Sequence, residues 1–112
     1  MNINEYLQKH KKFIETGLYK FRQVTPRLEC ADGFNMSVLV GKNLYCQPRV
    51  EDAPVYSHCE VGYPSAKEEA LMPYVDGNVH PDDGDDGWQT VYAEVPVEVI
   101  DEIITKHGGI KA

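Results

Sequence analysis

Five aspartates stand close together in a glycine-rich stretch, where their carboxylates could bind either a cation or a basic partner. Within eleven residues the sequence places Asp76, Asp82, Asp83, Asp85 and Asp86. An EF-hand calcium loop needs alternating oxygen ligands that end in a glutamate at the twelfth position, and this stretch lacks that pattern. A looser cation site, which would need six or more oxygens held together, stays open as an alternative. We expect an exposed acidic loop over residues 76–87 and predict no metal ligands.

The density of negative charge in this stretch is similar to that of a nucleic acid. Duplex DNA carries one charge about every 1.7 Å, and its protein partners match it with arginine and lysine side chains. Clustered aspartates could occupy a basic groove in the same way, and Trp88 could stack on an arginine of the partner. A solvated loop that only keeps the protein in solution is the alternative interpretation. The predicted partner-binding residues are Asp82, Asp83, Asp85, Asp86, Trp88, Glu68 and Glu69.

The cysteines and histidines do not form a recognisable metal or catalytic motif. Cys30 and Cys46 are isolated, while His58 and Cys59 are adjacent, so that in a strand they face opposite sides of the sheet. Zinc requires three or four such ligands at matching distances, and a cysteine nucleophile requires a base beside it. We therefore expect small buried thiols, no metal, no cofactor and no enzymatic activity.

Charge is unevenly placed along the chain. Its net charge is −7, with eight Lys and Arg against four Asp and Glu in residues 1–50, and three against fourteen in residues 51–112. This asymmetry indicates a polar partner surface. The length of 112 residues, 42% of them hydrophobic, predicts one domain over residues 1–112 with a small core. Three unpaired cysteines, a polar N-terminus and short apolar runs predict a cytoplasmic protein without a membrane span.

The last third of the sequence predicts a strand followed by an amphipathic helix. Apolar and polar residues alternate here, so Val91, Ala93 and Val95 are expected on one face of the strand. Pro96 ends the hydrogen-bonding pattern of the strand and can stand in the first turn of a helix. Gly108-Gly109 predict the end of that helix. Its apolar face is expected to contain Val99, Ile100, Ile103, Ile104 and His107.

The first half predicts a helix and then several strands. Asn4 is a candidate cap for a helix from Glu5 to about Thr16. The Asp32-Gly33 pair predicts a tight hairpin turn, because glycine adopts positive φ easily. That turn joins strands expected at residues 27–30 and 34–40. Further strands are predicted at residues 19–24, 44–46 and 55–63.

A third helix is predicted in the middle of the chain. Ser65 followed three residues later by Glu68 is a capping-box pattern, which favours a short helix through about Met72 that Pro73 ends. The predicted order is helix, three strands, helix, strand and helix. We therefore predict an α+β fold, in which an antiparallel sheet of about four strands carries an N-terminal helix, a short middle helix and a C-terminal amphipathic helix.

Three segments together resemble a group of small accessory proteins of phages and prophages in Gram-negative bacteria. They are Tyr45–Arg49, Val61–Ser65 and Val95–Ile110, and the likeness covers roughly residues 28–110. The resemblance implies a biological setting and brings no catalytic residues with it. Phage accessory genes often encode compact inhibitors of host defence or of host enzymes, and anti-CRISPR proteins are one such class.

Charge and resemblance together predict a non-enzymatic phage inhibitor, similar to anti-CRISPR proteins, that acts in the cytoplasm of the bacterial host cell. Its partner would be a host protein or ribonucleoprotein with a basic groove, bound without direct contact to nucleic acid or membrane. The alternative is a self-associating accessory or regulatory protein that pairs an exposed strand edge and mimics no nucleic acid. Both a monomer and a homodimer are compatible with the sequence.

Overall fold

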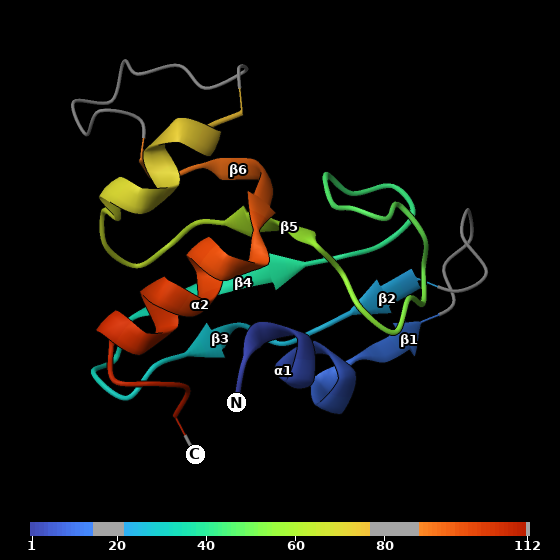
Figure 1. Cartoon of the computed structure of the whole chain (residues 1–112), viewed down its shortest axis with the longest axis horizontal. Coiled ribbons are helices and arrows are strands. Elements are labelled where there is room, and N and C mark those ends of the chain that lie inside the picture. Colours follow the sequence, from blue (N-terminus) through green and yellow to red (C-terminus); the bar gives the residue numbers. More distant parts are fainter. Residues whose placement is uncertain (15–21, 77–87, 112) are drawn as a thin grey trace.

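The computed structural model describes residues 1–14, 22–76 and 88–111 of the chain (Figure 1). The predicted acidic loop after Asp76 lies outside the described residues, and with it lie Asp82, Asp83, Asp85 and Asp86. Residues 19–21 of a predicted strand also lie outside them.

Two helices, a 3₁₀ helix and six strands make up the described part of the chain. They are α1 (Ile3–His10), β1 (Lys12–Ile14), β2 (Arg22–Val24), β3 (Leu28–Glu29), β4 (Asn35–Leu39), β5 (His58–Gly62), η1 (Glu69–Tyr74), β6 (Val91–Pro96) and α2 (Val97–Lys106). An antiparallel four-stranded sheet has the order β3-β4-β5-β6, and β1 pairs with β2 in a separate two-stranded sheet. The predicted α+β fold with a four-stranded antiparallel sheet is confirmed.

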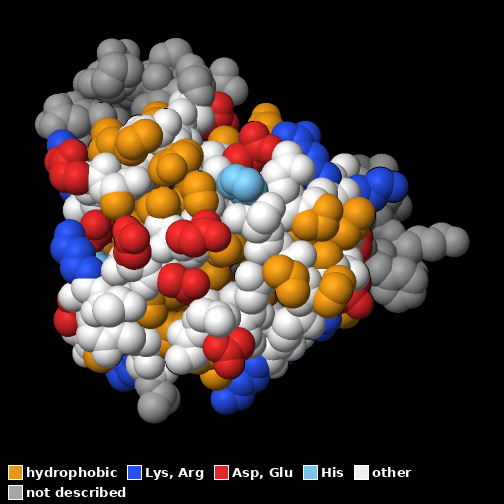
Figure 2. Space-filling model, in the orientation of Figure 1, with side chains coloured by type: hydrophobic (Ala, Val, Ile, Leu, Met, Phe, Trp, Pro, Cys, Tyr) orange, Lys and Arg blue, Asp and Glu red, His pale blue; other side chains and the backbone are white. Residues whose placement is uncertain are grey.

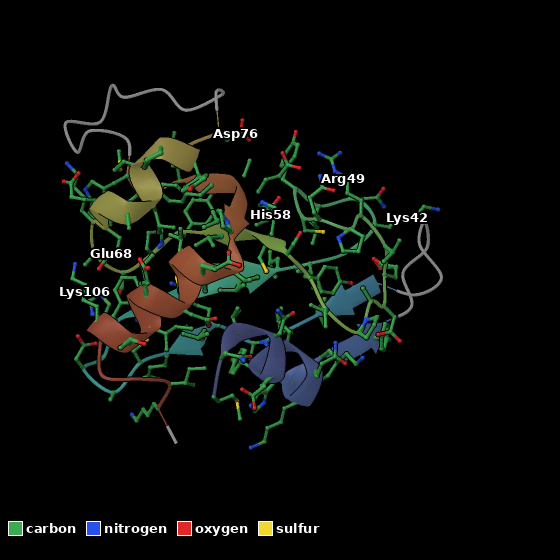
Figure 3. The ribbon with its side chains drawn as sticks, viewed as in Figure 1. Lys42, Arg49, His58, Glu68, Asp76 and Lys106 are labelled. Atoms are coloured by element: carbon green, nitrogen blue, oxygen red, sulfur yellow. The ribbon has the colours of Figure 1, made fainter. Side chains whose placement is uncertain are left out.

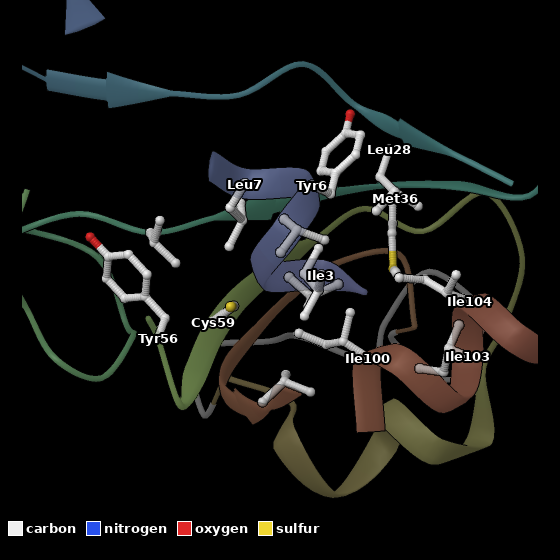
Figure 4. Close-up of a cluster of buried hydrophobic side chains, with 14 of the residues drawn as sticks. Ile3, Tyr6, Leu7, Leu28, Met36, Tyr56, Cys59, Ile100, Ile103 and Ile104 are labelled. Carbon is white, nitrogen blue, oxygen red and sulfur yellow. The ribbon is translucent and has the colours of Figure 1, made fainter. Parts of the chain in front are cut away.

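The hydrophobic core lies between the four-stranded sheet and the two helices α1 and α2 (Figures 1 and 4). In β4, Met36 and Val38 are buried, whereas the residues between them are half-buried, which is the period of a strand with one covered face. Ile3 from α1 and Ile100 from α2 meet these side chains and are fully buried. Each such aliphatic side chain stabilises the fold by about 1.5–3 kcal/mol.

The first helix is shorter than predicted and has a different cap. The side chain of Asn2 accepts a hydrogen bond from the backbone N–H of Glu5 (2.8 Å), and the Glu5 carboxylate accepts one from the N–H of Asn2 (3.1 Å). Asn4, the predicted cap, instead exchanges two hydrogen bonds with the backbone of Tyr56. The helix ends at His10, because Lys11 is extended and β1 follows at once to pair with β2.

The hairpin around Gly33 is confirmed. Gly33 has a φ of +96°, and the Asp32 carboxylate accepts a hydrogen bond from the N–H of Phe34 at 2.9 Å. The turn joins β3 and β4 in antiparallel register. By contrast, residues 44–46 form no strand. They belong to an irregular connection over residues 41–57, named here the 41–57 loop.

A β-bulge changes the expected faces of β6. Two residues of β6, Ala93 and Glu94, lie opposite the single residue Glu60 of β5, and Glu94 has a φ of +50°. The bulge shifts the alternation by one residue. Tyr92 and Val95 are therefore both buried, and the prediction that Tyr92 lies on the face away from Val95 is wrong.

The segment from Ser65 to Tyr74 also differs from its prediction. No α-helix begins at Ser65, whose hydroxyl accepts a hydrogen bond from the N–H of Asn35 at 2.9 Å. The capping-box interpretation is wrong, because Glu68 turns inward to charged partners and stands just before η1 without a side-chain cap. Pro73 lies inside η1 and does not end it. Ser65 and Glu68 thus match a capping box in sequence, but both bond to residues that are distant in the chain.

The helix α2 follows the sequence closely. Ile100, Ile103 and Ile104 are buried, and the helix is followed by Gly108 and Gly109, which have φ values of +89° and +90°. The N–H of Gly109 donates to the carbonyl of Ile104 at 2.8 Å, which satisfies one of the free carbonyls at the helix end. The predicted glycine stop is confirmed.

Both edges of the four-stranded sheet are covered by other parts of the chain. At β3, the N–H of Lys111 donates to the carbonyl of Glu29 (2.8 Å), and Cys30 forms a bridge with Ile110. At β6, Val75 forms a bridge with Tyr92, and the N–H of Asp76 donates to the carbonyl of Val91 at 3.0 Å. Covered edges of this kind prevent pairing with a strand of another molecule.

Candidate partner-binding face

Glu68, one of the predicted partner-binding residues, lies inside the protein. Its side chain is only 3% exposed, and its carboxylate contacts two cationic groups of α2 and the residue after it (Figure 3). Lys106 Nζ lies 3.2 Å from Oε2, and His107 Nε2 lies 2.5 Å from Oε1. The charge of Glu68 is therefore used to hold the fold together and is not presented to a partner.

His107 extends this contact to the turn between β3 and β4. Its Nδ1 lies 2.6 Å from a carboxylate oxygen of Asp32, and its ring stacks on Phe34 with centroids 4.1 Å apart and planes inclined by 8°. We name Asp32, Glu68, Lys106 and His107 the ion-pair junction. It joins a hairpin turn, the segment before η1 and the end of α2, which are distant in the sequence.

The protonated form of His107 suits this position, since both ring nitrogens then donate to carboxylates. Burial alone would lower the pKa of His107, but hydrogen bonds and charge interactions with Asp32 and Glu68 raise the pKa above its ordinary value of 6.5 overall. The pKa of Asp32 is lowered, first by the hydrogen bond from the Phe34 N–H and then by that from His107. His107 and Asp32 therefore each stabilise the charged form of the other.

Glu69 and Trp88, the other described residues of the predicted set, lie nearer the surface. Glu69 is 82% exposed and pairs with the exposed Lys67 at 3.4 Å. Trp88 is partly buried, and its backbone carbonyl accepts a hydrogen bond from the hydroxyl of Tyr92 at 2.5 Å. Together with the hydrogen bond from Asp76 to Val91, this contact places Asp76 and Trp88 beside the start of β6.

Two exposed acidic residues lie on the outer surface of α2. Glu98 and Glu102 are exposed and stand four residues apart, so they lie on one side of the helix. Neither carboxylate forms a hydrogen bond or an ion pair with any other described residue. Asp101 lies between them in the sequence and accepts a hydrogen bond from the N–H of Ile3 at 2.8 Å. We name Glu98, Asp101 and Glu102 the α2 face.

Apolar side chains lie next to the α2 face. Figure 2 shows acidic side chains gathered over α2 and hydrophobic atoms beside them, over η1 and β6. The partly buried apolar residues of this region are Met72, Tyr74, Val97 and Val99. η1 and β6 both pack against α2, so these side chains and the α2 face share one region of the molecule. Carboxylates beside apolar surface are suited to a partner that carries both basic and apolar groups.

The sequence assigned Glu98 and Glu102 to the polar side of a helix but not to a binding surface. The signal that could have found them is their spacing of four residues, with Asp101 between them, on a helix whose other side is apolar.

The cysteines are unsuited to nucleophilic chemistry. Cys30, Cys46 and Cys59 are free and buried, as expected from the sequence. Burial raises the pKa of Cys59 to about 12, so its thiol is protonated at neutral pH. The Nδ1 atom of His58 lies 2.8 Å from the hydroxyl oxygen of Ser57, so this nitrogen bonds to a serine and not to a cysteine. Among the described residues, no group of three or more His, Cys, Asp or Glu side chains is arranged to hold a metal ion.

A search of the described helices found none with the length and apolar character needed to cross a membrane. Comparisons of the chain with protein-family models, with curated proteins and with solved structures find no match.

Proposed function

We propose that this chain is a non-enzymatic, phage-derived inhibitor that binds a basic, nucleic-acid-binding groove of a host defence complex, in the manner of anti-CRISPR proteins. The observation that supports the proposal best is the α2 face, where the carboxylates of Glu98 and Glu102 are exposed and form no bond within the described residues. Glu98 lies in the first turn of α2, where a negative charge is favourable, but the like charge of Glu102 one turn later offsets part of this effect.

The contrast with other carboxylates of the chain strengthens the proposal. Asp32 and Glu68 pair with His107, Asp52 pairs with Lys11, and Glu29 pairs with Lys111. The α2 face is thus a region where negative charge faces solvent without a counter-ion among the described residues. A basic groove could exchange its bound phosphates for these carboxylates.

Edge-to-edge strand pairing, the alternative from the sequence, is not favoured. The outer edges of β3 and β6 are bonded to Ile110–Lys111 and to Val75–Asp76 of the same chain. A second molecule would have to displace these hydrogen bonds before it could add a strand. We therefore do not propose this route of association.

The test is protection of a targeted plasmid in bacteria that carry an active CRISPR system. Expression of the wild-type chain is expected to restore transformation by the plasmid in at least one of a panel of such systems. E98K/E102K is expected to weaken binding to the effector about tenfold, equivalent to about 1.4 kcal/mol, and to reduce protection accordingly.

A matched control variant separates the effect of the α2 position from the effect of the change in net charge. E29K/D52K makes the same change in net charge, but replaces exposed carboxylates that lie outside α2 and already have partners. This variant should protect the plasmid as well as the wild-type chain. No protection by the wild-type chain in any system, or equal loss in both double variants, would contradict the proposal.

A further inference from the structure

The 41–57 loop presents an apolar and basic surface. Tyr45, Val50 and Val55 are 43%, 44% and 62% exposed, which places three of the largest exposed apolar side chains in one loop. The guanidinium carbon of Arg49 lies 5.3 Å from the centre of the Tyr45 ring. Lys42 is exposed beside them (Figure 3). Tyrosine and arginine are the residue types that most often dominate protein–protein contacts.

The loop is held firmly although it has no regular secondary structure. The N–H of Glu94, at the bulge of β6, donates to the carbonyl of Tyr45 at 3.0 Å, and Gln47 donates to the carboxylate of Glu94. The buried thiol of Cys46 bonds to Gly41, and the hydroxyl of Tyr56 donates to the carbonyl of Val50 at 2.7 Å. The exposed side chains therefore need little ordering before they bind.

The two cations of this loop, Lys42 and Arg49, form no ion pair with a described residue. Of its two carboxylates, Asp52 pairs with Lys11 at 2.7 Å, whereas Glu51 accepts a hydrogen bond from the backbone N–H of Lys42 (3.0 Å) and keeps its charge. Nearby Glu60 accepts a hydrogen bond from the N–H of Tyr45. Two cationic side chains beside exposed apolar groups therefore remain for another molecule, opposite in sign to Glu98 and Glu102 of the α2 face.

Both surfaces are visible from the same side of the molecule. In Figures 1 and 3, which share one orientation, Arg49 and Lys42 lie to one side of His58 and α2 extends to the other. In Figure 2, hydrophobic and basic atoms cover the loop and acidic atoms cover α2. Two complementary patches on one face are the requirement for a self-complementary dimer.

We propose that two copies of the chain pair face to face, with the 41–57 loop of each copy against the α2 face of the other. The two-fold axis would run in the plane of the contact, between the two patches and close to His58. Lys42 and Arg49 of one copy would face Glu98 and Glu102 of its partner, and each contact would occur twice. Tyr45, Val50 and Val55 would cover the apolar side chains beside α2.

A second copy is favoured over a nucleic acid as the occupant of the loop. Two free cations among exposed apolar side chains match two free carboxylates beside apolar side chains, whereas nucleic-acid binding normally uses a larger set of basic contacts. The net charge of −7 on each copy opposes pairing at low ionic strength. At physiological salt, where charges more than about 8 Å apart are screened, the short-range pairs remain.

The proposed dimer does not depend on the proposed function, but it has a consequence for it. The dimer covers the α2 face, so a second copy and a basic target would compete for the same carboxylates. Pairing would then keep the acidic surface covered until a target displaces the second copy.

The test is the mass of the chain by light scattering at physiological salt, up to roughly 0.5 mM, where even a weak contact populates the dimer. The expected result is twice the monomer mass of 12.7 kDa. K42E/R49E and E98K/E102K should each give a monomer. The quadruple variant carries both changes, which restores opposite signs across the contact, and should dimerise again.

A control and circular dichroism complete the design. K67E/K111E makes the same charge change as K42E/R49E at exposed lysines outside the 41–57 loop, and should remain dimeric. Each variant is compared by circular dichroism to exclude unfolding. A monomeric wild-type chain, a dimer that both reversals leave intact, or a quadruple variant that stays monomeric would each overturn the proposal. These outcomes leave plasmid protection as a separate test of the proposed function.

Discussion

The ion-pair junction and the α2 face use the same chemical group in opposite ways. At the junction, the carboxylate of Glu68 is 3% exposed and bonds to Lys106 and His107. On α2, one turn or two before that junction, Glu98 and Glu102 are exposed and form no bond within the described residues. One helix therefore carries charge that holds the fold together and charge that remains free. The difference shows that a count of acidic residues does not locate a binding surface.

Burial explains why the two groups should respond differently to substitution. A carboxylate removed from water needs its counter-ions, so loss of charge at Glu68 leaves His107, which is 15% exposed, without one of its two carboxylate partners. A carboxylate in water is stabilised by water itself, so its removal has little effect on the fold.

Replacement of Glu68 by glutamine should destabilise the protein by about 2 kcal/mol, because charge-assisted hydrogen bonds to Lys106 and His107 are lost while the volume is kept. For a chain of this size the melting temperature should fall by roughly 10 °C. Thermal unfolding followed by circular dichroism measures this. Glu69→Gln is the matched control, since its neighbouring carboxylate is exposed and should change stability by less than about 0.5 kcal/mol. Equal losses of stability in the two variants would contradict the distinction between the buried Glu68 and the exposed Glu69.

The junction should also make stability depend on pH. Because the pKa of folded His107 is raised, its protonated form contributes stability that is fully present below pH 6.5 and is lost as pH rises through the folded-state pKa. The pKa of Asp32 is lowered, so its contribution persists until pH falls through that lowered value. In urea unfolding at a series of pH values, the free energy of unfolding of the wild-type chain should decline above pH 6.5.

His107→Gln tests the source of that decline. Glutamine can keep a hydrogen bond to one carboxylate but does not titrate, so the decline in unfolding free energy above pH 6.5 should be absent in this variant. A decline of unchanged size would show that another group causes it.

Neutralisation of the α2 face should leave the fold unchanged. E98Q/E102Q removes two exposed charges that repel each other, and the free energy of unfolding should change by less than about 0.5 kcal/mol. Urea unfolding beside Glu68→Gln gives the comparison directly. A loss near 2 kcal/mol would show that these carboxylates also serve the fold.

Local sequence patterns predicted those elements whose cause is local. The Asp32-Gly33 turn, the strand at 91–96 and the glycine end of α2 each follow from neighbouring residues, and the structure confirms them. The α+β class followed from their order. The buried cysteines followed from composition and spacing.

The predictions that proved wrong failed because of contacts between residues that are distant in the sequence. Glu68 was interpreted as part of a helix cap, whereas its true partners lie 38 and 39 residues away. Asn4 bonds to Tyr56 across a separation of 52 residues, which left Asn2 as the cap of α1. The bulge at Glu94 arises in pairing with β5 and is stabilised by the 41–57 loop, so the pattern of β6 alone could not predict it.

For the partner-binding surface, the sequence predicted the sign of the charge better than its position. Glu68 is buried, and Glu69 forms an ion pair with Lys67 of the same chain. Glu98 and Glu102 were not among the predicted partner-binding residues. Which of two acidic residues faces solvent depends on the packing of η1 and α2, and this is a property of the folded chain.

The most direct test of the proposed function is displacement of labelled DNA from a purified CRISPR effector that the plasmid assay identifies, followed by fluorescence anisotropy. The wild-type chain should displace the DNA, with an affinity that falls steeply as salt is added, and E98Q/E102Q should need roughly three times more protein, a smaller effect than that of the charge reversal E98K/E102K. Displacement that is independent of salt and equal for the wild-type chain and this folded variant would contradict a role for the α2 face.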